Sequence, residues 1–244
     1  MTPGDDVSFL DLKQSIAANL RRVRGRIAAA CERSGRRPEE VTVVGVSKGF
    51  PVSAVVAAYE AGLRDLGENR VQEAATKVEA AAALGARPRW HMVGHLQANK
   101  VKTALRLFDI IQSVDSLRRA ELISREARAP GPVLVEVNVA GEESKFGLAP
   151  DDAPGALARA RALPNIDVLG LMTVAPMTND PERVRPVFRW LRDLARSLDL
   201  PQLSMGMTDD FEVAVEEGAT IVRIGRAIFG ERPNAFERPR PSEE

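Results

Sequence analysis

The stretch that decides the fold is VTVVGVSKG, residues 41–49. Residues 41–46 are apolar at nearly every position, which predicts a strand covered on both faces, as strands of parallel sheets are. A helix is predicted after this strand, over residues 51–62. Before the strand, apolar residues recur at helical spacing over about residues 10–35, which predicts an extra N-terminal helix.

The strand–helix unit recurs along the chain. Further strands are predicted at 64–67, 90–93, 110–114, 133–138, 168–172, 202–205 and 220–224. Helices are predicted from near residue 69 and then at about 97–107, 117–129, 150–162, 181–198 and 208–218. Eight strands that alternate with helices in 244 residues favour a parallel (β/α)8 barrel, with an open doubly wound sheet as the alternative.

Composition limits the classes of protein that remain. The 34 basic and 34 acidic side chains give a formal net charge of zero, so nothing attracts the whole chain to nucleic acid or to an anionic membrane. One cysteine, Cys31, excludes a disulfide framework and a thiolate zinc site. No apolar run approaches the roughly 20 residues of a membrane helix, and no basic leader opens the chain. We expect a soluble, cytoplasmic protein with one barrel domain over residues 1–230 and a loose tail over 231–244.

Lys48 is the first candidate for chemistry, because barrel enzymes place their reactive groups where strands end. A lysine at a partly buried strand end loses hydration, which favours the neutral amine. A neutral amine can attack an aldehyde and form a Schiff base. The alternative is a lysine whose amine simply reaches solvent from the rim of the barrel.

An anion site is predicted where the last two strands end. Gly225 and Arg226 open a short helix after the eighth strand, where barrels often bind phosphate. Ser204 ends the seventh strand and could donate its hydroxyl to the same anion, or only cap a turn. Arg223 lies within the eighth strand and needs a partner, either a carboxylate such as Glu68 or Glu136 or a ligand at the barrel mouth.

Other polar residues have simpler interpretations. Asn69 is expected to cap the helix that follows it, although a capping residue at the mouth could also lean over a bound ring. His91 and His95 lack a carboxylate pattern that would make them metal ligands, and His91 is expected to be a hydrogen-bonded core residue. Tyr59, the only tyrosine, falls in mid-helix and is expected to pack against the barrel.

Five ordered motifs together resemble one family. They are residues 44–48, 67–73, 90–100, 203–210 and 222–230. Over residues 10–230 the chain is similar to the pyridoxal phosphate homeostasis protein family, whose fold resembles the barrel domain of alanine racemase. The resemblance implies that Lys48 holds pyridoxal 5′-phosphate as an aldimine. The other residues that it implies at the cofactor are Ser204, Gly225 and Arg226 at the phosphate, Arg223 at the pyridine nitrogen, and Asn69 and Met172 along the ring.

The loop over residues 138–147 also fits the family, with two departures nearby. Gly49 stands where a threonine is expected, and Phe146 is a bulky loop residue, so either could alter access to the cofactor. Lys100, Lys102 and Lys145 are further amines, and the sequence leaves open whether one of them binds a second aldehyde.

The resemblance implies a carrier of the cofactor in vitamin B6 homeostasis and no catalytic residues. Many pyridoxal enzymes place an acidic group at the pyridine nitrogen, whereas a cation there disfavours nitrogen protonation and weakens the electron sink. A racemase also needs an acid or base on each face of the bound substrate, and only Lys48 is evident. The alternatives are a low-activity amino-acid racemase and a lysine enzyme with aldolase-like chemistry. We expect a monomer that meets pyridoxal phosphate-dependent apo-enzymes transiently.

Overall fold

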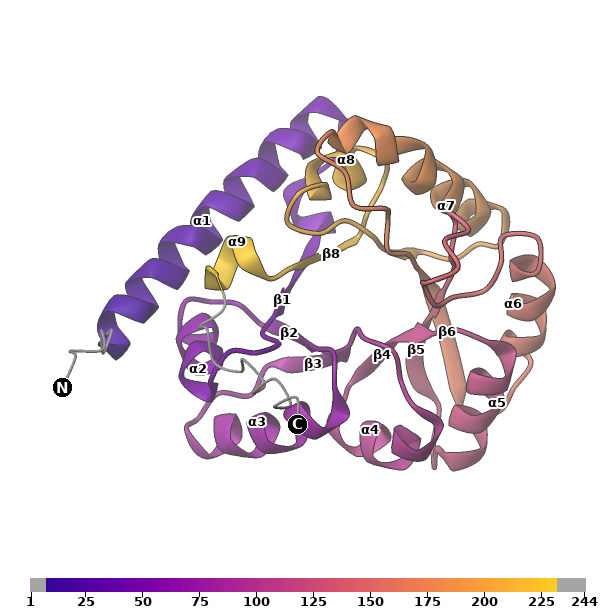
Figure 1. Cartoon of the computed structure of the whole chain (residues 1–244), viewed down its shortest axis with the longest axis horizontal. Coiled ribbons are helices and arrows are strands. Elements are labelled where there is room, and N and C mark those ends of the chain that lie inside the picture. The colour runs from indigo at the N-terminus through magenta and orange to yellow at the C-terminus, as the bar shows by residue number, and fades with distance from the viewer. Residues whose placement is uncertain (1–7, 232–244) are drawn as a thin grey trace, which may run out of the picture.

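Within residues 8–231, the part of the chain that the computed structural model describes, eight parallel strands close into a barrel (Figure 1). The strands are β1 (Thr42–Val46), β2 (Asp65–Glu68), β3 (Arg89–Met92), β4 (Ile110–Val114), β5 (Gly131–Glu136), β6 (Ile166–Met172), β7 (Gln202–Ser204) and β8 (Ile221–Ile224). They follow sequence order around the barrel, and β8 pairs with β1. The predicted (β/α)8 barrel is therefore confirmed, and the open sheet is wrong.

The helices surround the barrel (Figure 1). They are α1 (Phe9–Arg33), α2 (Val52–Glu60), α3 (Val71–Ala83), α4 (Val101–Leu107), α5 (Leu117–Glu126), α6 (Ala153–Arg161), α7 (Arg185–Ser197), α8 (Phe211–Glu216) and α9 (Arg226–Phe229). Short 3-10 turns precede β1, α4 and α7. Each of β1 to β8 has a helix after it in the chain, as the sequence pattern predicted.

The strand β5 differs most from its prediction. It begins at Gly131 rather than at residue 133, because Gly131 and Pro132 already pair with β6. Proline is tolerated there because it is near the start of the strand, where its missing N–H matters least. The strand ends at Glu136, and Val137 continues only as an isolated bridge to Leu148.

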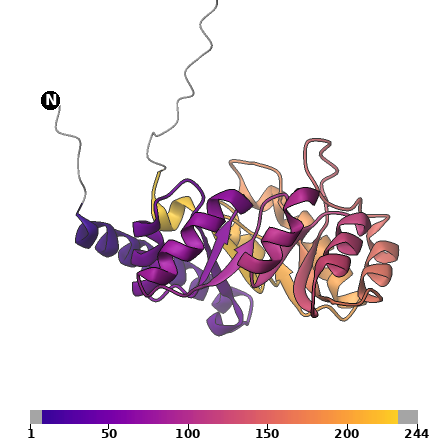
Figure 2. The ribbon, with the colours of Figure 1, turned by 90° about the horizontal axis from the view of Figure 1, so that it is seen from below.

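The extra helix α1 occupies the position that a long helix after β8 would fill. The helix α9, which does follow β8, has only four residues. One face of α1 is buried, at Ile16, Leu20, Val23 and Ile27, and the helix contacts α2, α8 and α9. Figure 1 shows it along the side of the barrel between α2 and α8, and Figure 2 shows it at the opposite end of the molecule from α6.

The core has two parts. The larger apolar cluster lies between the strands and the helices. A smaller one, made of Val44, Leu134, Met172 and Ile221, comes from strands alone and lies inside the barrel. Register places Arg223 and Asp65 beside Val44, so these polar residues share the interior face.

The predicted loose tail, residues 231–244, lies outside the described residues from residue 232 onward. None of the helices within residues 8–231 combines the length and the apolar character that a membrane span requires.

Candidate functional site

Arg223 is held inside the barrel by two neutral oxygen atoms. Its Nη1 donates to Ser204 Oγ at 2.6 Å, and its Nη2 donates to the Thr173 carbonyl at 2.7 Å. Burial lowers the pKa of Arg223 to about 10, against the opposing charges of Glu136 and Asp210, so the guanidinium stays charged at neutral pH. Glu68, one of the two carboxylate partners expected from the sequence, bonds elsewhere, so that expectation is wrong.

A chain of buried hydrogen bonds continues from Ser204 across the barrel. Ser204 Oγ donates to Gln112 Oε1 at 2.6 Å, and Gln112 Nε2 lies 2.8 Å from His91 Nδ1. His91 Nε2 lies 2.9 Å from Asp65 Oδ1. Because Ser204 must accept from Arg223 and a carboxylate can only accept, every bond in the chain points from Arg223 towards Asp65. The prediction that His91 is a hydrogen-bonded core residue is confirmed.

Asp65 ends this chain as a carboxylate. Burial opposes its charge, but hydrogen bonds from His91 and Arg89 outweigh burial and lower its pKa. Arg89 Nε donates to the same oxygen, Oδ1, at 2.6 Å. The buried chain therefore has a cation at one end and a paired carboxylate at the other, which fixes the position of Arg223.

Lys48 lies in a tight turn at the C-terminal end of β1. The residue is half-buried, and the Phe50 N–H closes the turn on the Ser47 carbonyl at 3.0 Å. Gly49 has φ +80°, in the left-handed region that glycine adopts without strain. This backbone geometry accounts for glycine at a position where the family resemblance led us to expect threonine.

The loops after β7 and β8 meet beside the same mouth. Arg226 Nη2 lies 2.5 Å from Asp209 Oδ1, and Thr208 Oγ1 lies 3.5 Å from the Ala227 amide in α9. Gly225 is the residue before α9 and leads from the strand into the helix. Thr208 was not among the residues predicted at the anion site. The sequence feature that could have identified Thr208 is its hydroxyl group in the loop after the seventh strand.

Ser204 differs from Thr208 in its surroundings. Its residue is fully buried, and its hydroxyl already accepts from Arg223 and donates to Gln112. These contacts favour a role in holding Arg223, whereas the Thr208 hydroxyl is the one beside α9. The place of Ser204 in an anion site stays a prediction.

Asn69 and Met172 lie at the ends of β2 and β6. The residue at the N-cap of α3 is Arg70, with no capping side-chain bond, so the predicted capping role of Asn69 is wrong. Asn69 instead packs against Gly94, where a Cβ would lie 2.5 Å from the Asn69 carbonyl oxygen. Met172 is fully buried in the interior apolar cluster.

Glu136 is a buried acid at the end of β5. It is 7% exposed, and burial raises its pKa to about 7, although the charge of Arg223 acts in the opposite direction and that of Asp115 adds to the rise. From the sequence, Glu136 was predicted only as a partner of Arg223. The sequence feature that could have identified Glu136 as a site residue is its position directly after the apolar run Val133–Val135, at the end of a barrel strand.

Replacing this acid should change how stability depends on pH. The folded protein keeps the Glu136 proton up to about pH 7, whereas an unfolded chain releases it near 4.5, so wild-type stability falls between these values. At about 1.4 kcal/mol per pKa unit, the loss is on the order of 3 kcal/mol. We expect Glu136→Gln to lack this loss, so that its stability relative to wild type rises between about pH 5 and about pH 8 in urea unfolding. Parallel pH curves for the two proteins would contradict this assignment.

The loop after β5 reaches across the rim of the barrel. The Phe146 ring stacks on His95, with centroids 3.8 Å apart and planes 15° apart, and His95 Nδ1 lies 2.8 Å from Asp115 Oδ2. Lys145 Nζ donates to the Ala175 carbonyl at 3.0 Å and to Glu142 Oε1 at 2.6 Å. The loop is thus attached to the segments that follow β3 and β6.

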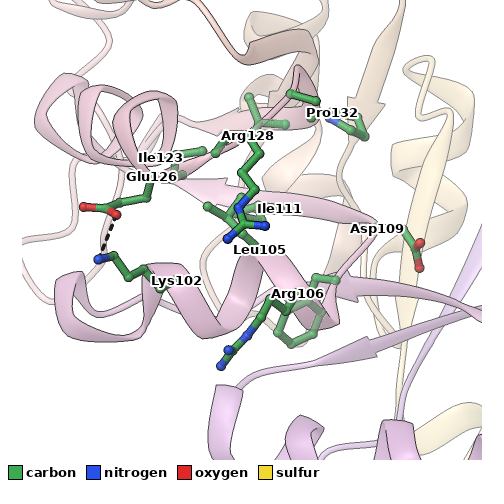
Figure 3. A pocket seen from close by; sticks show the side chains of 14 residues that line it. Lys102, Leu105, Arg106, Asp109, Ile111, Ile123, Glu126, Arg128 and Pro132 are labelled. Carbon is green, nitrogen blue, oxygen red and sulfur yellow. Dashed lines mark ion pairs between the residues drawn. The ribbon is translucent and has the colours of Figure 1, made fainter.

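A surface cavity of about 640 Å³ lies elsewhere, between α4, α5 and the start of β5 (Figure 3). Its walls include Leu105, Ile111 and Ile123, and Lys102 pairs with Glu126 at 3.3 Å. The lining residues come from α4 and α5, from the segments after them, and from the first residues of β4 and β5, so the cavity lies in the outer layer and is separate from the turn that carries Lys48. Among the described residues, no group of three or more His, Cys, Asp or Glu side chains could hold a metal ion.

Known proteins match this arrangement over most of the chain. The family described as alanine racemase, N-terminal domain, matches residues 13–233. The pyridoxal phosphate homeostasis protein of Aquifex aeolicus is 46% identical over 222 residues, which cover 87% of this chain and 96% of that protein. Its counterpart from Pseudomonas aeruginosa is 42% identical and covers 89% and 96%.

Solved structures show the same fold over most of the chain. A crystal structure of an unknown protein from Bifidobacterium adolescentis has a TM-score of 0.84 and 38% identity, covering 94% of this chain and 98% of that one. PipY of Synechococcus elongatus with PLP bound has a TM-score of 0.75 and 33% identity, covering 88% and 100%. Alanine racemase of Clostridium difficile shares the fold, with a TM-score of 0.68 and 15% identity.

The closed parallel barrel and the family match over residues 13–233 together identify a barrel of the alanine racemase N-terminal domain type. More closely, the chain belongs to the pyridoxal phosphate homeostasis protein family, as its motifs predicted.

Proposed function

We propose that this protein binds pyridoxal 5′-phosphate at the C-terminal mouth of the barrel and serves vitamin B6 homeostasis without robust catalysis. The observation that carries the proposal is that an amine, a buried cation and the paired loops come from three adjacent strands, β1, β8 and β7. The related PipY structure with PLP bound and the names of the curated relatives support it.

The donor set of the mouth suits this cofactor. Lys48 supplies the amine that would bond to the aldehyde, and Arg223 supplies the charge that would face the pyridine nitrogen. The phosphate would lie at the Gly225 and Arg226 backbone, where the Thr208 hydroxyl adds a donor and Ser204 remains a candidate. Asn69 and Met172 would line the ring.

Several features of the chain's own residues favour a carrier. Arg223 stays charged at neutral pH, so it would oppose protonation of a nitrogen placed beside it. Tyr59 lies in α2, with the Arg64 guanidinium 4.5 Å over its ring, and therefore cannot serve as an acid at the mouth. Pyridoxal phosphate, when bound, supplies electron withdrawal to amino-acid substrates, and a weakened sink suits storage better than turnover.

A second candidate function is a low-activity amino-acid racemase. Glu136 favours it, because a carboxyl with a pKa of about 7 at the end of β5 is a possible second acid or base. If this candidate is correct, purified protein will racemise an amino acid, and Glu136→Gln will abolish that activity while cofactor binding persists.

The test of the carrier proposal is a titration of purified protein with pyridoxal 5′-phosphate. We expect a visible absorption band that borohydride abolishes, with the added mass on the peptide that contains Lys48. Assays with alanine and other amino acids should show no turnover above that of buffer with free cofactor. Colourless protein without added mass would overturn the proposal.

We place the protein in the cytoplasm as a monomer that meets pyridoxal phosphate-dependent apo-enzymes transiently. Size-exclusion chromatography with light scattering checks the monomer. Reactivation of an apo-enzyme by the loaded protein, faster than by the same concentration of free cofactor, checks the transfer.

Phe146 should control how fast the cofactor exchanges. Removing its ring deletes the stack on His95 that attaches the loop to the segment after β3. We expect Phe146→Ala to release the cofactor several-fold faster, by roughly the 0.5–1.5 kcal/mol of an aromatic pair. Stopped-flow capture by an apo-enzyme measures the rate. Leu84→Ala, an exposed apolar residue after α3, is the control, and equal rates in both variants would refute the assignment.

A further inference from the structure

Lys77 is a buried cation on the apolar face of α3. It is 7% exposed and shares this face with Val71, Ala74 and Ala81. Lysine is almost never buried unless it is paired. Its Nζ contacts three oxygen atoms, the Ser47 carbonyl at 2.7 Å, Glu68 Oε1 at 2.8 Å and Glu73 Oε1 at 2.6 Å.

These contacts reach the backbone on both sides of Lys48. Lys77 Nζ donates directly to the carbonyl of Ser47, the residue before it. Glu73 Oε1, which Lys77 also holds, accepts from the amide of Gly49, the residue after it, at 2.6 Å. One ammonium group therefore anchors both peptide groups that flank Lys48.

The side chain of Ser47 adds a third attachment. Its Oγ donates to Glu68 Oε1 at 2.6 Å, the same oxygen that Lys77 contacts. Glu68 is fully buried, and its second oxygen, Oε2, has no hydrogen-bond partner. Only Oε1 of Glu68 is hydrogen-bonded, and Lys77 is the cation that it contacts. Because charge-assisted hydrogen bonds are strong in a buried site, we expect the position of the Glu68 carboxylate to depend strongly on Lys77.

A purely structural pair would join α3 to β2 by side chains alone. Here two of the contacts end on the backbone of the turn, and Gly49 within that turn has φ +80°. The turn has one backbone hydrogen bond of its own, from the Phe50 amide to the Ser47 carbonyl, and α3 adds two further hydrogen bonds to its backbone. The backbone of Lys48 is thus set by α3 as well as by β1.

We propose that Lys77, together with Glu73, is a positioning residue that fixes the turn carrying Lys48 and so directs the Lys48 amine towards the cofactor aldehyde. The proposal deepens the proposed function and rests on it for the identity of the aldehyde. The attachment of the turn itself does not depend on that identity.

The test compares Lys77→Met, Glu73→Ala and the control Lys13→Met in the full-length protein without cofactor. Lys13 pairs with Glu60 at 2.6 Å between α1 and α2, so its loss removes an ion pair away from the turn. Amide hydrogen exchange is followed residue by residue. We expect the Gly49 amide to exchange at least about tenfold faster in Lys77→Met and Glu73→Ala, with β5 and β6 unchanged, and no change in Lys13→Met.

Pyridoxal 5′-phosphate titration is the second measurement. We expect the affinity to fall by about tenfold in both turn variants and to stay at the wild-type value in Lys13→Met. Lys77→Arg should recover part of the loss, because a guanidinium keeps the charge and can donate to the same oxygen atoms.

Three results would overturn the proposal. These are unchanged Gly49 exchange, uniformly faster exchange over the whole barrel, and faster Gly49 exchange with unchanged affinity. Glu73 is half-buried, so Glu73→Ala decides the matter if Lys77→Met does not fold. Wild-type protein that binds no cofactor would refute the proposed function, while the Gly49 exchange would still decide whether Lys77 fixes the turn.

Discussion

Lys48→Ala is expected to lose the visible, borohydride-sensitive band completely when pyridoxal 5′-phosphate is added. An alanine methyl group has no lone pair to attack an aldehyde, whereas Arg223 and the loops after β7 and β8 are left in place. Residual binding should therefore persist, weakened on the order of 100-fold, which corresponds to about 2.7 kcal/mol. Absorbance titration and equilibrium dialysis measure the two effects separately.

Lys102→Ala is the matched control for this experiment. Lys102 is exposed, pairs with Glu126 of α5 and lines the cavity of Figure 3 in the outer layer of helices, whereas Lys48 lies in the turn after β1. Lys102→Ala should keep both the band and the wild-type affinity. A band that survives in Lys48→Ala would show that another amine reacts, and Lys145, in the loop after β5, would be the next residue to replace.

Gly94→Ala is expected to destabilise the protein and to disturb the mouth at the same time. A Cβ on Gly94 would lie 2.5 Å from the Asn69 carbonyl oxygen and 2.7 Å from its Cα. Both atoms are backbone, so neither can rotate away, and the two loops must separate. We expect a loss on the order of 3 kcal/mol in urea unfolding and a weaker affinity for the cofactor, because Asn69 moves.

Gly25→Ala is the control for a glycine with space around it. Gly25 lies within α1 and has no atom within 4 Å of the position of an added Cβ. Alanine favours helix over glycine by up to about 1 kcal/mol, so this variant should gain stability. If Gly94→Ala unfolds at the same urea concentration as wild type, the close approach of the loops after β2 and β3 is wrong.

The comparison of α3 with its prediction shows how local signals can mislead. Asn69 followed by Gln72 is a capping pattern, yet the helix begins one residue later, with Arg70 at the N-cap. Asn69 instead lies close against Gly94, and that contact joins residues 25 positions apart. A pattern of neighbouring residues does not contain such a contact.

Ser204 and Lys77 illustrate the same limit. Ser204 is predicted at an anion, which stays a prediction, and only the structure shows that its hydroxyl joins Gln112, 92 positions away, and Arg223 on the neighbouring strand. Lys77 was not selected at all, although a lysine on the apolar face of an alanine-rich helix was a visible signal. Its partner carbonyl at Ser47 is 30 positions away.

The sequence by itself determined the barrel, the extra N-terminal helix, the family and the place of Lys48 at the end of β1. These features follow from the repeated spacing of apolar residues and from local motifs, which are short-range properties of the chain. Only the tertiary structure decided the direction of the buried hydrogen-bond chain and the attachment of the Lys48 turn. Closing the barrel brings distant polar groups together out of water, and each must then find a partner among the others.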